Sequence, residues 1–423
     1  MHSSERPHFH IIGAGLAGLA AAVRLAGSGH TVTVHEGSLQ VGGRCRTYQD
    51  HATGMSIDNG THLVLSGNHA LLSFAEIIGS QAELQGPANA EFSFIDCENN
   101  ERWKLQFSDG RFPWWVFDKD RRVPQTAFTD YLPLARLLWS STDKPLAEVM
   151  NCTGPTYDRL IAPLLLAALN IEPRQGSASL ARAVVRETLA LGGKACRPLL
   201  ARNGIGNVFV EPAVNYLQQR GVSILIQDEL RAVQLTGGHI EALEFAGRKI
   251  SIAESDAVIL AVPPYAAQSL LPDLKIPTEF RGIVNAHFRV DPPAHLPPLL
   301  GVINGTCEWI FAHPGRISVT VSDAGRLFEM PRADLAAMLW RDVAQIAGIS
   351  DVLPPWQIVR ERRATFAATP EQNARRPSTE TGWRNLFLAG DWTATGLPAT
   401  LEGAVRSGYR AAQLAEHSVR AAA

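Results

Sequence analysis

Three glycines near the start of this chain have the spacing needed for nucleotide chemistry. Gly13, Gly15 and Gly18 follow the apolar run at residues 8–12 and open a stretch rich in alanine and leucine, which predicts a strand, a turn and a helix. In such a turn Gly13 makes the bend, Gly15 lets the backbone approach a pyrophosphate, and Gly18 packs the helix on the strand. The turn, which includes Ala14, brings phosphates to the helix N-terminus, where free N–H groups point outward.

A carboxylate ends the second predicted strand, residues 31–36. Glu36 is placed there to accept hydrogen bonds from a ribose diol, and its charge argues against the 2′-phosphate of NADP. FAD and NAD remain. Gly43 and Arg44 then supply a small residue and a cation for the pyrophosphate, although a surface turn with solvated arginines is the alternative. The sequence holds no second such glycine motif, so electrons must pass through a separate carrier, oxygen or the substrate.

Composition narrows the class of protein. The 39 basic and 41 acidic residues nearly cancel, which excludes a bulk electrostatic attraction to nucleic acid. The five cysteines lack metal-like spacing and cannot form a complete disulfide set, so we expect no metal and a reducing cytoplasm. The N-terminus lacks a secretory apolar core, and no run reaches eighteen apolar residues. We therefore expect a cytoplasmic protein that is either soluble or rests peripherally on the inner membrane.

Local patterns predict the elements that must position these residues. Further strands are expected at residues 221–226, 229–235, 240–245 and 256–264, with Gly237-Gly238 as a hairpin turn and one helix over residues 208–219. The apolar run at residues 160–171 is interrupted by Pro163 and Asn170. A buried core helix is its default interpretation, and the alternatives are an apolar tunnel or a peripheral membrane contact.

In these motifs the chain resembles the flavin amine oxidase and phytoene desaturase superfamily, in which the glycine turn continues into a Gly-Gly-Arg segment. The resemblance implies an α/β fold with a discontinuous Rossmann-type FAD-binding domain and an inserted α+β substrate domain. The FAD-binding domain would comprise residues 1–85, 205–270 and 376–423, and the substrate-binding domain residues 86–204 and 271–375. Both ends of the chain would then hold one FAD.

The same resemblance assigns FAD contacts along the chain. The turn at Gly60 and Thr61, within Asp58-Asn-Gly-Thr-His62, would approach the flavin ring. The backbone near Val233 would meet the adenine, while plain sheet packing is an equal interpretation of its side chain.

Near the C-terminus, Gly390 and Asp391 would lie beside the ribityl chain and pyrophosphate. A helix beginning at Leu401, with Glu402 and Ala404 in its first turn, would direct its amides to the flavin O2 region, where its dipole stabilises negative charge on the reduced ring.

Residues 392–400 and the run at 163–170 resemble more closely one branch of this superfamily, the hydroxysqualene dehydroxylases of bacterial hopanoid synthesis. This resemblance covers essentially the whole chain. It implies that hydroxysqualene, a long apolar isoprenoid, loses its hydroxyl as water and accepts hydride from FADH2, and that an unidentified external reductant regenerates FADH2. The hydroxyl needs a proton donor to leave, for which His62 and Asp58 are candidates. Local backbone hydrogen bonds are the alternative for both.

Three other functions stay open from the sequence. A carotenoid desaturase would use the same fold in the oxidative direction. A flavin amine oxidase would need an aromatic cage, to which Trp392 could contribute. A prenyl-lipid carrier would keep the architecture without redox turnover, but the glycine turn, Glu36 and Gly390-Asp391 argue against it, because a carrier has no use for an FAD site.

Overall fold

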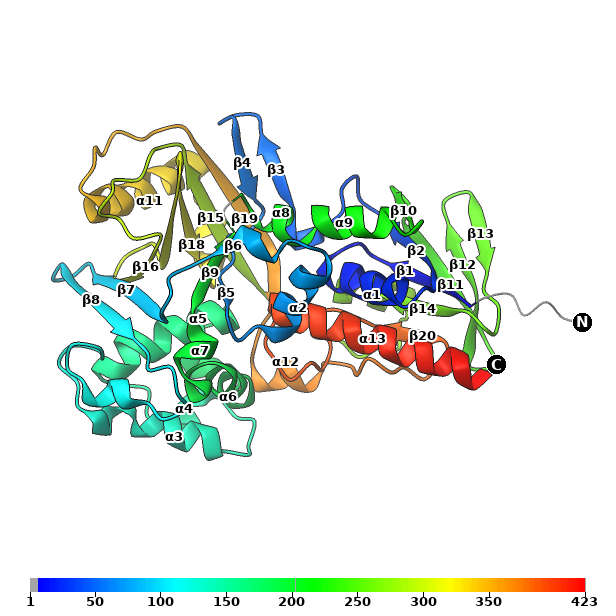
Figure 1. The fold of residues 1–423 in the computed structure, drawn as a ribbon, viewed down its shortest axis with the longest axis horizontal. Helices are drawn as coiled ribbons and strands as arrows, with labels where there is room; N and C mark the ends of the chain where they lie inside the picture. Colours follow the sequence, from blue (N-terminus) through cyan, green and yellow to red (C-terminus); the bar gives the residue numbers. More distant parts are fainter. Residues whose placement is uncertain (1–6, 202, 423) are drawn as a thin grey trace, which may run out of the picture.

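A five-stranded parallel sheet organises one lobe of the molecule, shown on the right in Figure 1. The computed structural model describes residues 7–201 and 203–422. In spatial order the strands are β10 (Ser223–Ile226), β2 (Thr31–Glu36), β1 (His8–Ile12), β14 (Ala257–Leu260) and β20 (Leu386–Leu388). They come from distant parts of the chain and confirm the predicted α/β fold with a Rossmann-type sheet.

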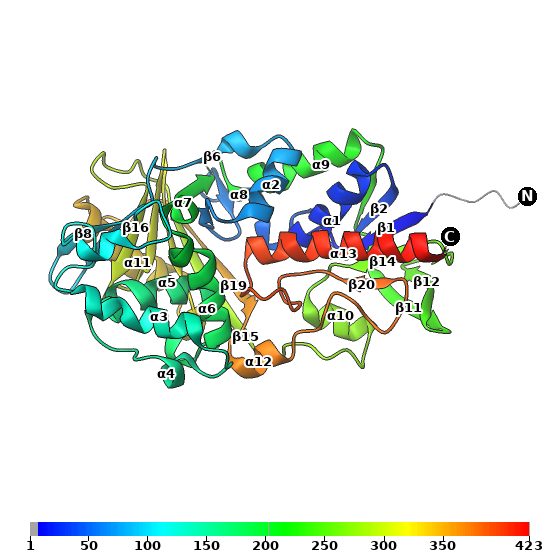
Figure 2. The same ribbon diagram turned by 60° about the horizontal axis from the view of Figure 1, so that its bottom comes forward.

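The first and last helices lie side by side against this sheet. In Figures 1 and 2, α13 (Leu401–Ala422) runs along α1 (Leu16–Gly27). At Gly408 the two helices approach so closely that a Cβ atom would overlap the carbonyl oxygen of Ala17. Glycine therefore permits the close approach of α1 and α13, which cover one face of the sheet together.

A seven-stranded sheet forms the second lobe. Its strands, in spatial order, are β19 (Trp356–Phe366), β15 (Phe280–Phe288), β18 (Arg316–Val321), β17 (Trp309–His313), β16 (Leu299–Ile303), β7 (Glu91–Asp96) and β8 (Glu101–Gln106). Neighbours are antiparallel except β16 and β7. Helix α11 (Arg332–Ala347) packs on one face. Two segments far apart in sequence thus share one sheet, while the exact domain boundaries given above remain predictions.

Short helices lie beneath the second sheet in Figure 1. They include α3 (Leu132–Trp139), α4 (Leu146–Val149), a π-helical turn (Tyr157–Ile161), α5 (Ala162–Leu169), α6 (Ala178–Glu187) and α7 (Gly193–Cys196). The apolar run at 160–171 is helical, with Leu160, Leu165 and Leu169 buried, and it ends at Asn170 in the left-handed conformation. In the described part of the chain, no helix is long and apolar enough to cross a bilayer.

The hairpin predicted around residues 237–238 is present. It joins β11 (Leu230–Thr236) to β12 (His239–Phe245), and β13 (Arg248–Ser251) extends the sheet. Gly237 and Gly238 both have positive φ, 58° and 81°. This is the backbone conformation that favours glycine in a tight hairpin turn.

The single helix predicted over residues 208–219 is wrong. The structure has α8 (Ile205–Phe209) and α9 (Glu211–Gln218), with a break at Val210. Pro212 lies in the first turn of α9, where its missing N–H is tolerated, whereas inside one continuous helix it would remove a hydrogen bond.

A buried arginine holds the C-terminal connection between β20 and α13. Arg376 is 8% exposed and its guanidinium lies over the Phe366 ring. It donates hydrogen bonds to the carbonyl oxygens of Asp391, Trp392, Thr393 and Leu397 and to the hydroxyl of Thr395. Burial lowers the pKa of Arg376 to about 10, so the side chain stays charged at neutral pH. One side chain therefore satisfies four of the seven backbone carbonyl groups of residues 391–397.

Replacing this arginine should destabilise the protein. We expect Arg376→Leu to lower the free energy of unfolding by about 3 kcal/mol or more, because several buried acceptors lose their donor together. Urea unfolding would measure the change. Arg384→Gln is the matched control, since Arg384 is exposed and should shift the midpoint little. Equal midpoints for the two variants would contradict the role given to Arg376.

Candidate functional site

The three glycines of the first turn have different surroundings. Gly13 has φ +102°, and a Cβ there would lie 2.5 Å from the Ala261 carbonyl oxygen. A Cβ on Gly18 would overlap the Gly13 carbonyl oxygen. At Gly15, in contrast, no described atom lies within 4 Å of the Cβ position. Two glycines therefore serve packing, and the third borders open space, as a cradle for a ligand requires.

The N-terminus of α1 faces this open space with its amides free. Gly15 is the N-cap, and no described side chain caps the helix or puts an acid in its first turn. The next loop closes over the turn, because the Gly42 N–H donates to the Ala14 carbonyl oxygen at 2.8 Å. Gly43 has φ +54°, and its Cβ position lies 3.5 Å from the Gly15 Cα. Unsatisfied N–H groups at a helix N-terminus suit a pyrophosphate.

Glu36 is held at the end of β2 by protein contacts. Its Oε2 accepts the Ala14 N–H at 2.8 Å, and its Oε1 accepts from the N–H and hydroxyl of Ser38 at 2.8 and 2.6 Å. A carboxylate oxygen can accept two hydrogen bonds, so Oε2 retains an acceptor position. The geometry leaves Glu36 compatible with its predicted ribose contact.

An ion pair joins the two ends of the chain. Arg44 Nη2 lies 2.7 Å from Asp391 Oδ1, and the Asp391 side chain is 8% exposed. The same guanidinium donates to the Ala364 carbonyl oxygen on β19. The Asp391 carboxylate raises the pKa of Arg44 above its usual value, so the arginine is permanently charged. Sequence analysis placed both residues at the cofactor but did not foresee that they pair with each other.

Glycine is required at position 390 because the Trp392 side chain lies close against the backbone there. It has φ +145°, and a Cβ there would lie 2.5 Å from Trp392 Nε1. Its N–H donates to Ser407 Oγ on α13 at 2.8 Å. Trp392 is buried and donates from Nε1 to the Val262 carbonyl oxygen at 3.0 Å. This indole packs on the Gly390 backbone, which leaves it unsuited to the aromatic cage considered above.

Of the three residues predicted to contact the flavin from the first turn of α13, only two have backbone amides available for a ligand. The Ala404 N–H donates to the Thr400 carbonyl oxygen, so it is used within the helix. The amides of Leu401 and Glu402 precede that bond and have no intrahelical acceptor, which keeps them available for a ligand. The Glu402 carboxylate instead accepts the N–H groups of Ala70 and Leu71, at the start of α2 (His69–Ile77).

Asp58 has a structural role. Its Oδ1 accepts the Thr47 hydroxyl and the Ile205 N–H, the latter at 2.9 Å at the start of α8. Burial raises its pKa, although these hydrogen bonds oppose the shift. Because Asp58 holds β4 (Met55–Asp58) to α8, its assignment as the proton donor stays a prediction that these contacts do not support.

Unpartnered polar atoms gather around Gly60. Thr61 Oγ1, His62 Nε2 and Asn285 Nδ2 are buried, and none has a hydrogen-bond partner among the described residues. His62 Nε2 and Asn285 Nδ2 lie 3.4 and 3.8 Å from the Cβ position of Gly60. Burial, reinforced by the charge of Arg44, lowers the pKa of His62 to about 4, so the ring is neutral at pH 7. Buried polar atoms left this way indicate a polar ligand at this point.

Asn285 was missed by sequence analysis. It lies in the middle of β15, and its Oδ1 accepts the Thr61 N–H at 3.3 Å and the Thr320 hydroxyl at 2.8 Å. These two contacts fix the amide with its Nδ2 3.8 Å from the Cβ position of Gly60. An amide within a largely apolar strand was the available signal, but the partner on the turn at Gly60 is visible only in three dimensions.

Val233 lies on β11, in the sheet next to the parallel sheet, and its half-buried side chain packs on the core. The side-chain position fits the packing interpretation and leaves its backbone contact with adenine a prediction.

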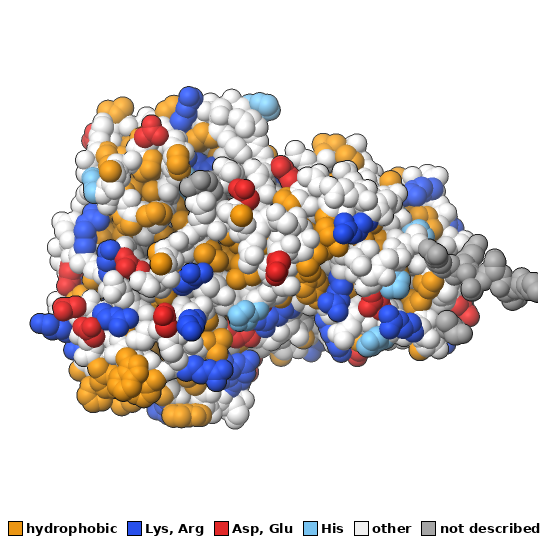
Figure 3. Space-filling view, in the orientation of Figure 1, with side chains coloured by type: hydrophobic (Ala, Val, Ile, Leu, Met, Phe, Trp, Pro, Cys, Tyr) orange, Lys and Arg blue, Asp and Glu red, His pale blue; other side chains and the backbone are white. Residues whose placement is uncertain are grey.

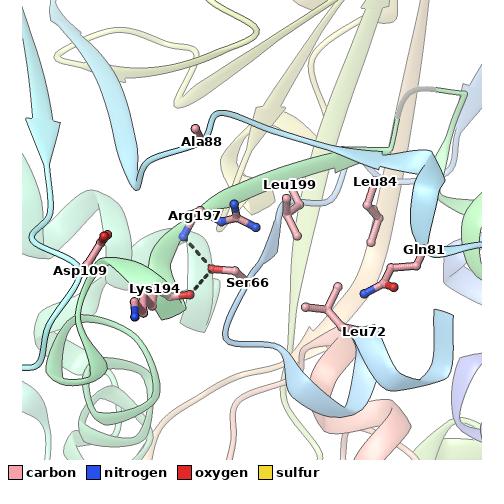
Figure 4. Close-up of a pocket in the computed structure, with 9 residues that line it drawn as sticks. All are labelled: Ser66, Leu72, Gln81, Leu84, Ala88, Asp109, Lys194, Arg197 and Leu199. Carbon is pink, nitrogen blue, oxygen red and sulfur yellow. Dashed lines mark hydrogen bonds between the residues drawn. The ribbon is translucent and has the colours of Figure 1, made fainter. Parts of the chain in front are cut away.

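A separate pocket of about 570 Å³ lies between α2 and β9 (Pro198–Ala201), as Figure 4 shows. Ser66 Oγ accepts the Arg197 N–H at 3.0 Å and donates to the Lys194 carbonyl oxygen at 2.7 Å. Its lining includes none of the predicted cofactor residues. We therefore do not assign it to the cofactor.

Comparisons with known proteins agree with this geometry. Residues 16–415 match the family model described as flavin containing amine oxidoreductase. The chain is 59% identical over 406 residues to the hydroxysqualene dehydroxylase of Rhodopseudomonas palustris and 56% identical over 406 residues to that of Sinorhizobium fredii. Each alignment covers 96% of this chain and 97% of the relative. The chain belongs to the hydroxysqualene dehydroxylase branch of the flavin-containing amine oxidoreductases.

A solved structure shows the same fold. Cyclohexylamine oxidase from Brevibacterium oxydans superposes with a TM-score of 0.71 at 17% identity, covering 98% of this chain and 99% of that protein. Family membership makes the chain an FAD-dependent oxidoreductase, and the open Gly15 cradle with the free α1 amides fits that cofactor. The desaturase, amine oxidase and carrier alternatives are not favoured by relatives of this similarity.

Substitutions at Gly15 and Gly18 should distinguish a glycine that binds the cofactor from a glycine that is needed for packing. We expect Gly15→Ala to leave the stability of the flavin-free protein nearly unchanged and to weaken FAD binding strongly, because its methyl group would occupy the ligand space. Gly18→Ala should instead lower the free energy of unfolding by about 1–3 kcal/mol through overlap with the Gly13 carbonyl. Thermal melts of flavin-free protein and flavin titrations would measure both. Unimpaired FAD binding by Gly15→Ala would contradict the assigned cradle.

Proposed function

We propose that this protein catalyses the reductive dehydroxylation of hydroxysqualene to squalene, within squalene and hopanoid synthesis. Near full-length similarity to proteins named hydroxysqualene dehydroxylase carries this proposal. The C–O bond breaks, the hydroxyl leaves as water after gaining a proton, and a hydride takes its place on carbon. Reduced FAD supplies that hydride when bound, and an external reductant must restore it.

The polar atoms at Gly60 support a binding site for the departing hydroxyl. Asn285 Nδ2 is a donor with no partner among the described residues, and Thr320 and Thr61 hold its amide in place. His62 is neutral at pH 7, so it would bind the hydroxyl by a hydrogen bond before any proton transfer. We propose that Thr61, His62 and Asn285 contact the hydroxyl oxygen. Of the two predicted proton donors, Asp58 is engaged elsewhere, and neutral His62 must first gain a proton before it can pass one to the leaving hydroxyl.

We propose that apolar side chains of the large buried cluster surround the hydrocarbon of the bound substrate. This cluster includes Phe366, Trp392 and Leu169. A long hydrocarbon would gain free energy by leaving water for apolar surroundings, and a dry site would prevent water from capturing the carbocation left by the hydroxyl. A substrate of this kind partitions into lipid, so we also propose that the protein works at the inner membrane surface.

The proposed reaction can be tested in a single turnover. Protein reduced under anaerobic conditions and mixed with hydroxysqualene should form squalene in an amount equal to the flavin that is oxidised. Absorbance reports the flavin, and chromatography the product. Persistently reduced flavin without squalene would refute the function. Oxidised protein mixed with phytoene is the control, and bleaching of its flavin would favour a carotenoid desaturase instead.

Asn285 should be needed for this turnover. We expect Asn285→Ala to slow single-turnover flavin oxidation by roughly 10²-fold, the cost of losing one donor to a reacting oxygen, with flavin content retained. Its melting temperature should fall modestly, because the Thr61 N–H and the Thr320 hydroxyl lose their acceptor. Asn207→Ala is the matched control, because the Asn207 amide donates locally to the Asn203 carbonyl oxygen. A normal rate in Asn285→Ala would remove Asn285 from the proposed hydroxyl site.

A further inference from the structure

Six large hydrophobic side chains are exposed between residues 112 and 139. We call them the aromatic patch: Phe112, Trp114, Phe117, Phe128, Leu132 and Trp139, with exposed fractions of 52, 65, 52, 50, 60 and 84%. Figure 3 shows hydrophobic side chains gathered at the lower left, where Figure 1 places the segment leading into α3. Exposed clusters of this kind mark interaction surfaces.

The aromatic patch is an ordered surface. The Phe112 and Trp114 ring centroids are 4.3 Å apart, and Phe117 stacks on Phe128 at 5.3 Å. Leu132 and Trp139 lie seven residues apart on α3, so they share one face of the helix, while Leu134 and Leu137 are buried. The six side chains of the aromatic patch shield one another only partly from solvent, so each stays at least half exposed. Buried neighbours such as Leu134 and Leu137 anchor the segment that carries them.

The aromatic patch connects to the apolar interior. Trp115 is buried directly beneath it and packs edge-on against Phe107 and Tyr131, at 4.9 and 5.1 Å. A surface groove of about 650 Å³ adjoins the patch. Its lining mixes apolar residues such as Leu132, Trp139 and Val149 with polar and charged ones such as Arg136, Lys144 and Glu148.

Charges around the aromatic patch have no dominant sign. The segment from residue 109 to residue 144 exposes charges of both signs. The exposed basic residues are Arg111, Lys119, Arg136 and Lys144, and the exposed acidic residues are Asp109, Asp118, Asp120, Asp130 and Asp143. Attraction to an anionic surface is therefore weak here, and burial of apolar area is the available driving force.

We propose that the aromatic patch inserts into the surface of a lipid bilayer and so holds the protein at the membrane in which its substrate resides. The identification of lipid as the partner rests on the proposed function, because a C30 hydrocarbon substrate resides in the bilayer. Tryptophan and phenylalanine suit the boundary between lipid head groups and acyl chains, because their rings bury apolar area there. Because the charges around the aromatic patch nearly cancel, binding should not need anionic lipid, and a bilayer of neutral lipid should be enough.

Vesicle flotation of the flavin-loaded protein tests this proposal. Vesicles of phosphatidylcholine alone should bind the protein, raised salt should leave binding unchanged, and brominated acyl chains should quench tryptophan fluorescence. We expect the double variant Trp114→Ser, Trp139→Ser to reduce the partition coefficient at least about tenfold. Leu39→Ser, Val352→Ser is the matched control, because these residues are 68 and 75% exposed outside the patch. Its binding should equal that of the unmodified protein.

Turnover with detergent-dispersed hydroxysqualene separates this proposal from the proposed function. Absent vesicle binding, or equal binding by both double variants, would overturn the aromatic patch as a membrane contact even if turnover is normal. Patch-dependent vesicle binding without any turnover would support the membrane contact while refuting the reaction. Self-association that disappears in the tryptophan double variant, without vesicle binding, would identify a second copy of the chain as the partner and also overturn the proposal.

Discussion

The ion pair between Arg44 and Asp391 is the contact on which the arrangement of the site depends. It joins the loop after β2 to the loop after β20, and the same arginine reaches β19 of the second sheet through the Ala364 carbonyl. Three parts of the chain that are far apart in sequence therefore meet at one guanidinium. Because Asp391 is almost fully buried, loss of Arg44 would leave an uncompensated charge, so each partner constrains the other.

The surroundings of this ion pair divide into rigid and open parts. Arg376 donates to the carbonyl groups of Asp391, Trp392, Thr393 and Leu397, and Trp392 packs on Gly390, so the loop that carries Asp391 is held from both sides. At Gly15, by contrast, no described atom lies near the Cβ position, and α1 has no side-chain cap. A rigid frame beside an open glycine turn suits a dinucleotide, because little ordering remains to be done on binding.

The side chains proposed to contact the hydroxyl are themselves uncharged, although the Arg44–Asp391 ion pair is near enough to influence the pKa of His62. His62 is kept neutral by burial and by Arg44, and the other candidate donors at Gly60 are a hydroxyl and an amide. Neutral donors suit a reaction on an apolar substrate, since they bind one hydroxyl group without adding a charge beside the hydrocarbon. At the other end of the second lobe, the aromatic patch presents apolar surface outward. The two features describe a protein adapted to a molecule that is almost entirely hydrocarbon.

Sequence by itself determined the local elements of this protein. The glycine turn, β1, β2 and the hairpin at Gly237-Gly238 follow from hydrophobic period and turn chemistry, which act over a few residues. The start of α13 at Leu401 was expected from the family resemblance. The segment 208–219 is an exception, because it was predicted as one helix although Pro212 favours the start of a new helix, α9. Tertiary structure alone decided that Arg44 pairs with Asp391, that Arg376 fills the C-terminal loop, and that Asn285 meets Thr61. The first and third contacts join residues more than two hundred positions apart, and Arg376 reaches carbonyl groups 15 to 21 positions away, beyond the span of a single helix turn or hairpin. No local pattern encodes which buried donor will meet which acceptor.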